Sequence, residues 1–515
     1  MGLDPDRAPV VIASAQVVSR YRSTTALELA EQAATEAIDN VGALRDRITG
    51  ISLVNVLSAM PEAPVAALSS LLGLDAPGRE VTTIGGNSPQ WLVTRIASKI
   101  AGGMPGAWLI VGAEALHSAR SASRSDREPA RSASRAGLDA RHEGSDAHGD
   151  RRPPPRSPAV EIEPDEQVGD PRPGTSALET SVGLLAPVHI YSIIESSLAD
   201  RFDRSAVEHR EALGNMMAGF SRVASRNPFA WFREPHSPSE ISTPSPSNRL
   251  VTEQCTKLMS AFLSCDMSSA LIITSLGEAR RLGITAEPMF IVGGIDIDDV
   301  WAVSARRDLS RSPAMSAGAR TLLDACSMSI DDISAFDLYS CFPSAVEIAA
   351  DAIGASLDDH RGLTTTGGLA YFGGPGSNYS THAIATMSER LRETAGAGLV
   401  TALGWFATKH SMGLYSARPP ANGFVAPDTS LLQKAIDATA VEVAPRAEGR
   451  ATVLAYTVAY AHDGRPSFAP AIARLPDGRH VVARAEPDQL EHLPNADLVG
   501  REIVVSGVPP GYRVL

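Results

Sequence analysis

Residues 363–379, LTTTGGLAYFGGPGSNY, decide the fold of this chain. A threonine-rich, strand-like run leads into two adjacent glycines, a second glycine-rich turn and the start of a helix. This order is typical of the loops that surround active sites in α/β enzymes. The turn contains no histidine, cysteine, aspartate, glutamate or lysine, so it supplies no acid, base or nucleophile. The segment indicates the frame of a catalytic site without its chemical groups.

The same order of elements occurs a second time, closer to the N-terminus. Residues 82–88, TTIGGNS, match residues 364–370, TTTGGLA, and residues 48–58 share the pattern of residues 333–343. At both places we expect a strand, a helix, a strand, a glycine turn, a helix and a strand. Such alternation predicts largely parallel strands with helices packed on the sheets. Coincidence between two ordinary α/β segments is the alternative explanation.

Length and composition narrow the function classes. A chain of 515 residues is too long for one core, and roughly two to four domains are expected. The net charge of -13 argues against non-specific binding of nucleic acid, which needs a basic face. No apolar run reaches the length of about 18 residues that a membrane-spanning helix needs. The four cysteines have no C-x-x-C spacing, which favours a reducing compartment and a cytoplasmic location.

An insertion and a tail flank the second half of the repeat. Residues 117–157 contain ARSASR twice and then RRPPPR, and they are poor in apolar side chains. Such a segment cannot bury enough surface to offset its ordering entropy, so we expect a mobile surface excursion. From about residue 422 the chain reads as short alternating strands, with Asp-Gly turns at residues 463–464 and 477–478. This pattern predicts a small, mostly antiparallel β barrel.

Several segments together resemble the thiolase superfamily, whose members make or break carbon–carbon bonds between acyl-CoA units. They are VVIASAQVV at 10–18, LIVGAEAL at 109–116, TKLMSAFLSCDMSSALIITS at 256–275, DLYSCF at 337–342 and FGGPG at 372–376. In the family, the positions of DLYSCF and FGGPG carry an Asn-Glu-Ala-Phe motif and a Gly-His-Pro motif. The tail resembles the extra C-terminal domain of actinobacterial thiolase-like proteins, which are commonly labelled acetyl-CoA acetyltransferases. It is also similar to an oligonucleotide/oligosaccharide-binding (OB) barrel.

The resemblance implies an α/β fold that is a duplicated thiolase fold. Two βαβαβαββ halves form α-β-α-β-α layers, with an inserted loop domain and a small C-terminal β-barrel-like domain. The expected domains are residues 1–116 with 259–300 for the N-terminal half, 117–258 for the loop domain, 301–421 for the C-terminal half and 422–515 for the OB-like domain.

Thiolase chemistry needs a cysteine nucleophile, a histidine that activates it, a second cysteine as acid or base, and donors for an oxyanion. Carried onto this chain, the nucleophile falls on Gly86 and the Gly-His-Pro histidine on Gly374. The asparagine and glutamate of the third motif fall on Tyr339 and Ser340, and the second cysteine on Gly404. The resemblance therefore implies that the family's catalytic set is lost. We also expect the glycines to widen the pocket.

Two other side chains remain as candidates for chemistry. His410, in TKHSMG, is expected on a loop after the last core strand and is the best surviving general base; a structural role is the alternative. Cys341 follows Ser340 directly and offers a substitute nucleophile; an inert, packed cysteine is the alternative.

These observations favour a degenerate thiolase-like protein of lipid metabolism that binds an acyl-CoA or related acyl thioester. No covalent cofactor, no metal, no nucleic-acid partner and no membrane partner are expected. One alternative is an active acyltransferase or carbon–carbon lyase with a relocated site that uses His410. Another is a non-enzymatic partner subunit. The family usually dimerises, but the insertion and the tail favour a monomer.

Overall fold

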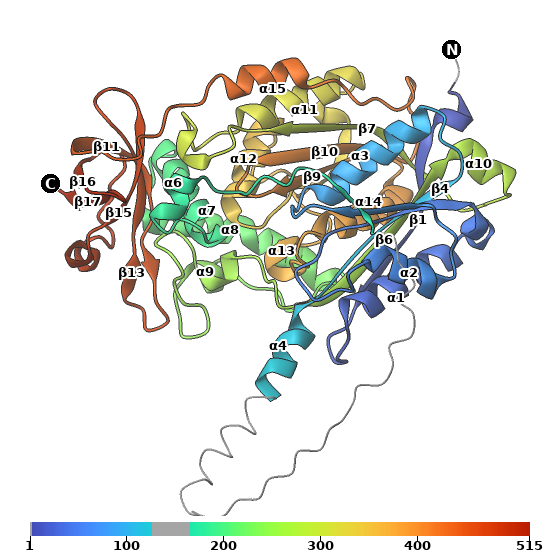
Figure 1. The fold of residues 1–515 in the computed structure, drawn as a ribbon, viewed down its shortest axis with the longest axis horizontal. Coiled ribbons are helices and arrows are strands. Elements are labelled where there is room, and N and C mark those ends of the chain that lie inside the picture. Colours follow the sequence, from blue (N-terminus) through green and yellow to red (C-terminus); the bar gives the residue numbers. More distant parts are fainter. Residues whose placement is uncertain (1–2, 126–163) are drawn as a thin grey trace, which may run out of the picture.

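The computed structural model describes residues 3–125 and 164–515 (Figure 1). Ten strands form the main sheet in the order β5-β3-β2-β4-β6-β1-β7-β10-β9-β8. In that order they are β5 (Glu166–Val168), β3 (Gly78–Thr82), β2 (Ile48–Leu53), β4 (Ala107–Ala115), β6 (Asp266–Ser275), β1 (Pro9–Val18), β7 (Met289–Asp298), β10 (Lys409–Ser416), β9 (Ala397–Gly404) and β8 (Ile333–Asp337).

The sheet consists of two halves that meet between β1 and β7. These two strands pair only at Val10 with Phe290 and at Val11 with Met289. Helices α3 (Ser88–Ala101) and α14 (Tyr379–Thr394) contact strands of both halves and each other, so they form the layer between them. Central strands such as β4 are buried along their whole length, which explains their continuous apolar sequence. The expected duplicated, layered α/β fold is confirmed.

Further helices cover the two outer faces of the halves (Figure 1). On the N-terminal half these are α1 (Ala26–Asp39), α2 (Pro64–Leu72) and α10 (Leu276–Arg281), and on the C-terminal half they are α11 (Pro313–Ala325) and α12 (Pro343–Ile353). α1 begins with a capping box between Thr25 and Glu28 and buries an alanine-rich face. The halves differ in one respect. Residues 363–366, which occupy the place that β3 has in the N-terminal half, do not form a strand. One backbone hydrogen bond, from Leu338 N–H just after β8 to Leu363 O at 2.9 Å, connects them to the sheet edge.

The inserted region is mostly helical where it is described. It contains α4 (Leu116–Ser125), α6 (Ala177–Ser181), α7 (Pro187–Arg201), α8 (Ala206–Arg226) and α9 (Pro238–Ser242). The short helix α13 (Gly368–Tyr371) follows later and contacts α8. Residues 117–125, expected to belong to a mobile excursion, instead belong to α4, which projects from the body (Figure 1). The rest of that expected excursion, from residue 126, lies outside the described residues.

The tail forms the expected small barrel. After α15 (Ser430–Asp437), five strands close in the order β11-β14-β15-β17-β16. They are β11 (Gly449–Tyr456), β14 (Pro470–Arg474), β15 (His480–Ala485), β17 (Gly511–Val514) and β16 (Glu502–Ser506); β12 (Ala459–Tyr460) and β13 (Pro466–Phe468) form a separate ribbon. The barrel packs on α7, where Tyr456 N–H donates to Ser196 Oγ at 2.9 Å. The barrel therefore packs against the inserted helical region of the same chain.

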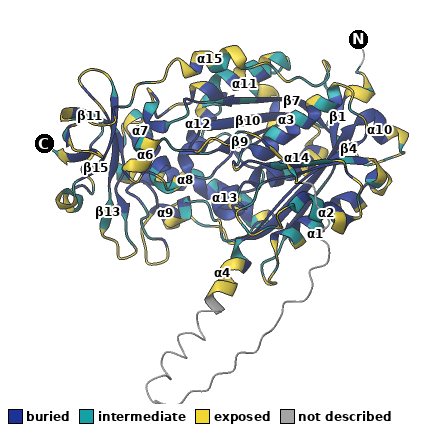
Figure 2. Ribbon diagram, viewed as in Figure 1, coloured by how far each residue is buried: buried dark blue, intermediate teal, exposed yellow. Residues whose placement is uncertain are grey.

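Burial follows the layers, because the strands and the central helices are buried while the outer helices keep an exposed face (Figure 2). No helix within the described ranges combines the length and the apolar character that crossing a membrane requires.

Candidate functional site

The two glycine turns that the sequence singled out lie together at the starts of α3 and α14. Gly85 N–H donates to Ser377 Oγ, and Ser380 Oγ donates to Gly86 O, both at 3.2 Å. α3 begins at Ser88 with a proline in its first turn, where a missing N–H costs no helical hydrogen bond. The fold thus assembles the frame of a catalytic centre around Gly86.

Tyr339 fills the space beside Gly86. A Cβ atom at residue 86 would overlap the Tyr339 hydroxyl oxygen and would lie 2.7 Å from Tyr339 Cζ and 2.6 Å from the carbonyl oxygen of Leu403. Favourable contacts between carbon atoms lie at about 3.5–4.0 Å. The expectation that a glycine here widens the pocket is therefore wrong, because the tyrosine takes the room that a nucleophile's side chain would need.

Tyr339 and its neighbour Ser340 are held in structural roles. The Tyr339 ring packs edge-on against Tyr379, with centroids 5.5 Å apart. Burial raises the pKa of the Tyr339 phenol well above its ordinary value, so the phenol stays protonated. Ser340 Oγ accepts the N–H of Leu369 at 3.2 Å and so anchors the start of α13. Neither residue resembles a positioned acid or base.

Gly374 differs from Gly86 in having room for a side chain. Its N–H donates to Phe262 O at 2.9 Å. A Cβ atom there would lie 3.4 Å or more from its neighbours, in ordinary contact with Leu263 and Leu369. The position of the family's histidine is thus open enough for a small side chain, but the chain supplies none.

Lys409, a residue that sequence reasoning missed, lies against the first glycine turn. Its Nζ donates to Ile84 O at 3.3 Å, beside Gly85. Burial lowers the pKa of Lys409, although the charges of Asp170 and Asp298 oppose that shift. At Gly404, the expected position of the second cysteine, a Cβ atom would lie 2.8 Å from the Lys409 side chain. The Lys409 side chain therefore lies beside Gly404, the expected position of the second cysteine.

His410 is placed by the fold in β10, and not on the loop where it was expected. The residues on either side of it, Lys409 and Ser411, contact the first glycine turn and its helix start. Because side chains alternate between the two faces of a strand, the His410 ring lies on the opposite face. There His410 Nε2 lies 3.0 Å from Asp299 Oδ2 and 3.3 Å from Ser312 Oγ. Ser312 also caps α11 by accepting the N–H of Met315 at 2.9 Å.

This His–Asp–Ser group does not have the geometry of a catalytic triad. A triad uses one ring nitrogen for the carboxylate and the other for the serine. Here both partners meet Nε2, and Nδ1 has no hydrogen-bond partner among the described residues. His410 is 1% exposed. The structure thus brings His410 neither to Gly86 nor to Gly374, and the group serves the packing of α11 on β10.

Cys341 is half-buried and is not activated. Burial raises the pKa of its thiol to about 12, so almost no thiolate is present near neutral pH. The phenol of Tyr191, which is itself buried, forms a hydrogen bond with the thiol. The inert, packed cysteine is the interpretation that the geometry favours.

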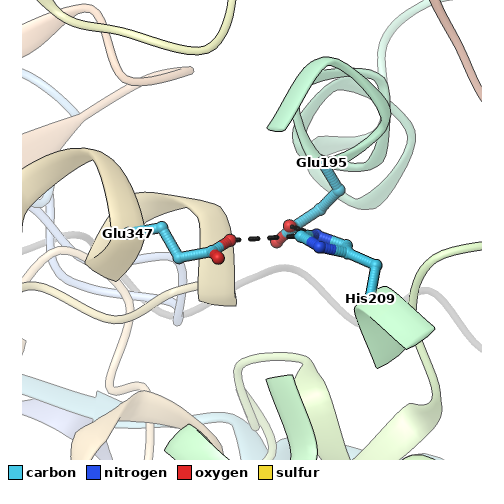
Figure 3. A group of neighbouring side chains, drawn as sticks. All are labelled: Glu195, His209 and Glu347. Carbon is cyan, nitrogen blue, oxygen red and sulfur yellow. Dashed lines mark hydrogen bonds and ion pairs between the residues drawn. The ribbon is translucent and has the colours of Figure 1, made fainter. Parts of the chain in front are cut away.

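A second group of ionisable side chains lies away from the glycine turns, where no motif pointed. Glu195 on α7, His209 on α8 and Glu347 on α12 meet in the interior (Figure 3). His209 Nε2 lies 2.9 Å from Glu195 Oε2 and 3.9 Å from Glu347 Oε2. Burial raises the pKa of Glu195 to about 7 and that of Glu347 to about 8, and burial lowers the pKa of His209. The residues come from three helices, so their sequence spacing carries no signal.

A cleft of about 1050 Å³ reaches this group from outside. α8, the loop at residues 357–365 and the end of α14 form its walls. Arg204, Arg222 and Arg226 line it, and none of them forms an ion pair with a carboxylate in the described part of the chain. Apolar side chains of α8, including Met216 and Phe220, line it as well. The cleft therefore offers arginines without ion-pair partners and an apolar wall, although carboxylates such as Glu389 and Glu393 line it too.

Comparisons with known proteins agree with this architecture. The family model of the thiolase-like protein type 1 additional C-terminal domain matches residues 431–507. A crystal structure of a monomeric SCP2-thiolase-like protein type 1 from Mycobacterium smegmatis is 28% identical, covers 100% of both chains and has a TM-score of 0.81. No curated protein matches the chain in a sequence search.

More distant structures share the fold alone. The acetyl-CoA acetyltransferase of Syntrophomonas wolfei is 15% identical, with 80% of this chain and 99% of that chain covered and a TM-score of 0.54. The dimeric peroxisomal thiolase of Saccharomyces cerevisiae is 13% identical, with 80% and 98% covered and a TM-score of 0.54. The chain therefore has the thiolase fold, is similar over its whole length to an SCP2-thiolase-like protein of type 1, and carries the additional C-terminal domain of that type.

Proposed function

We propose that this chain is a non-catalytic, thiolase-like protein that binds an acyl-CoA or a related acyl thioester. The cleft beside α8 supports the first part of the proposal, that the chain binds such a ligand. Its unpaired arginines match the phosphates of a CoA-type ligand, because a guanidinium donates paired hydrogen bonds to phosphate oxygens. Its apolar wall matches an acyl or pantetheine chain, and its volume of about 1050 Å³ is that of a site for a sizeable small molecule.

The packing of Tyr339 against Gly86 supports the second part of the proposal, that the chain is not a catalyst. A covalent acyl intermediate needs a nucleophile, and the position where the family has one is a glycine packed against Tyr339. The alternative of a relocated site that uses His410 loses its support, since that ring faces α11 and has no access to solvent.

Calorimetric titration with CoA and acetoacetyl-CoA tests the binding half. We expect Arg222→Ala with Arg226→Ala to weaken binding by about 10-fold or more. Arg513→Ala is the matched control, because that arginine is exposed on the barrel and paired with Asp488. Equal affinity of the double variant and the control would place the ligand elsewhere, and no binding by the wild-type chain would refute the proposal.

A thiolysis assay with acetoacetyl-CoA tests the other half. We expect no turnover above the rate without protein. A kcat within the usual enzyme range of about 1–1000 per second would show that the chain is a catalyst after all.

We further propose that the chain acts as a monomer in a reducing, cytoplasmic compartment. The relative from M. smegmatis is described as monomeric, and all four cysteines are free. Light scattering should give the chain mass of 54.1 kDa; twice that mass would show a dimer.

A further inference from the structure

Glu195, His209 and Glu347 form a compact group of metal-binding side chain types. One ligand atom from each lies within 4.8 Å of the others. Each comes from a different helix, and each side chain is at most 1% exposed. Because α7, α8 and α12 are packed together around this point, the three groups are held in place by the fold and not by a flexible loop (Figure 3).

Polar atoms of this group lack the partners that buried polar atoms normally have. Neither carboxylate oxygen of Glu347 meets an N–H or O–H donor at hydrogen-bond distance within the described residues. Its nearest charged partner in the group is His209 Nε2, at 3.9 Å, and the adjacent carboxyl of Glu195 pairs with it only if one of the two holds a proton. Glu195, in contrast, accepts the N–H of Ser344 and lies at hydrogen-bond distance from His209. A buried polar atom left without a partner costs about 1–3 kcal/mol. The Glu347 carboxylate is aimed at the group (Figure 3), so the arrangement lacks a positive centre between these side chains.

The cleft provides a path to the group. Glu347 and Arg204 both line it, while Glu195 and His209 lie behind them. The positive charge of Arg204 acts on Glu347 and on His209, but Arg204 Nη1 has no hydrogen-bond partner within the described residues. An ion that enters from the cleft therefore meets Glu347 first and then the two inner ligands.

We propose that Glu195, His209 and Glu347 bind one divalent transition-metal ion, with Zn²⁺ and Mn²⁺ as the probes of choice. One imidazole and two carboxylates suit these ions, whereas Mg²⁺ and Ca²⁺ prefer oxygen ligands alone. Ligand atoms about 2.0–2.2 Å from an ion lie closer together than the 4.8 Å limit of this group, so binding draws the side chains inward. The cleft side stays open for water or a ligand, as at catalytic metal sites.

The chemistry of the group explains why a metal ion fits better than a proton. A proton shared between Glu195 and Glu347 neutralises only one of the two buried carboxyls. A divalent ion accepts lone pairs from both carboxylates and from the imidazole at once. The inference is independent of acyl-thioester binding, because the test uses metal ions alone.

Titration of the metal-stripped, untagged full chain with ZnCl₂ and MnCl₂ tests the site. We expect saturation at one ion per chain. Glu347→Gln should weaken the affinity by more than about 100-fold, since even partners behind the ligands contribute 10–100-fold. Glutamine keeps the shape of the protonated side chain, so this variant should fold. Glu195→Gln is the second variant, and it should lose affinity to a similar degree.

Glu389→Gln is the matched control, because Glu389 lines the same cleft but does not belong to the group. Its affinity should equal that of the wild-type chain. Two results would overturn the proposal: no saturable binding by the wild-type chain, or equal affinity of Glu347→Gln and Glu389→Gln. The second result would assign the ion to scattered surface carboxylates or to another part of the chain.

Discussion

Adding one methyl group at residue 86 tests whether Tyr339 really occupies the nucleophile's place. In Gly86→Ala the new Cβ atom meets the Tyr339 hydroxyl and lies 2.6 Å from Leu403 O. Insertion of a methyl into a filled core costs about 1–3 kcal/mol. We expect the upper end of that range, because one of the two obstacles is a backbone carbonyl and cannot rotate away. The free energy of unfolding should fall accordingly.

A double-mutant cycle assigns this cost to the contact. Tyr339→Ala alone should cost about 3–5 kcal/mol, as other large-to-small aromatic changes in cores do. In the double variant the methyl group added at residue 86 has room on the tyrosine side. The cost of the double change should then be smaller than the sum of the single costs by about 1 kcal/mol or more. Urea denaturation followed by tryptophan fluorescence measures all four proteins.

Gly374→Ala is the matched control for the same methyl group. There the Cβ atom has neighbours at 3.4–3.5 Å, and the backbone is not left-handed. We expect a change of less than about 0.5 kcal/mol. Additive costs at Gly86 and Tyr339, or equal costs at Gly86 and Gly374, would refute the reasoning that Tyr339 blocks the site.

Two further predictions follow from pKa values. Cys341, whose pKa is raised to about 12 by burial, should react with iodoacetamide at pH 8 at least about 100-fold more slowly in the native protein than in urea, as read by mass spectrometry; equal rates would show an exposed thiol. Burial raises the pKa of Asp296 to about 7, against about 3.9 in the unfolded chain. Between these values the folded state binds the extra proton, so the stability from this group falls as pH rises toward 7. Asp296→Asn should flatten that part of the stability–pH curve, and an unchanged slope would contradict the assignment.

The frame was predictable because its signals are local. Alternating apolar strands, helical runs and glycine turns repeat along the chain, and each is read within about twenty residues. The barrel was equally readable, since the turn at Asp477–Gly478 joins β14 to β15 as expected. The expectation for His410 was wrong because a polar TKHSMG reads as a loop. In the structure β10 lies between β7 and β9, and its buried polar side chains find partners elsewhere in the fold, such as Asp299 for His410.

The side-chain contacts of the site were not predictable, because their partners are distant in the chain. Gly86 and Tyr339 come from different halves of the fold, and no spacing rule connects them. At Gly86, the expectation of a widened pocket assumed that neighbouring side chains leave the space beside a glycine empty. Close packing does not allow that, since an interior fills the space that a missing side chain would leave. The Glu195–His209–Glu347 group was missed because its members come from three different helices and no spacing rule connects them.

His410 offers a final test that separates a structural role from a chemical one. In His410→Gln, Asp299 loses the partner that lies 3.0 Å away and keeps Ser312. Burial opposes the ionisation of Asp299, and the hydrogen bond from His410 is the main influence that holds the pKa of Asp299 below its ordinary value. Removing a partner of a buried charged group costs about 1–3 kcal/mol, so the urea midpoint should fall. Affinity for CoA should not change, because the ring faces α11. Loss of CoA binding with unchanged stability would instead restore His410 to a functional site.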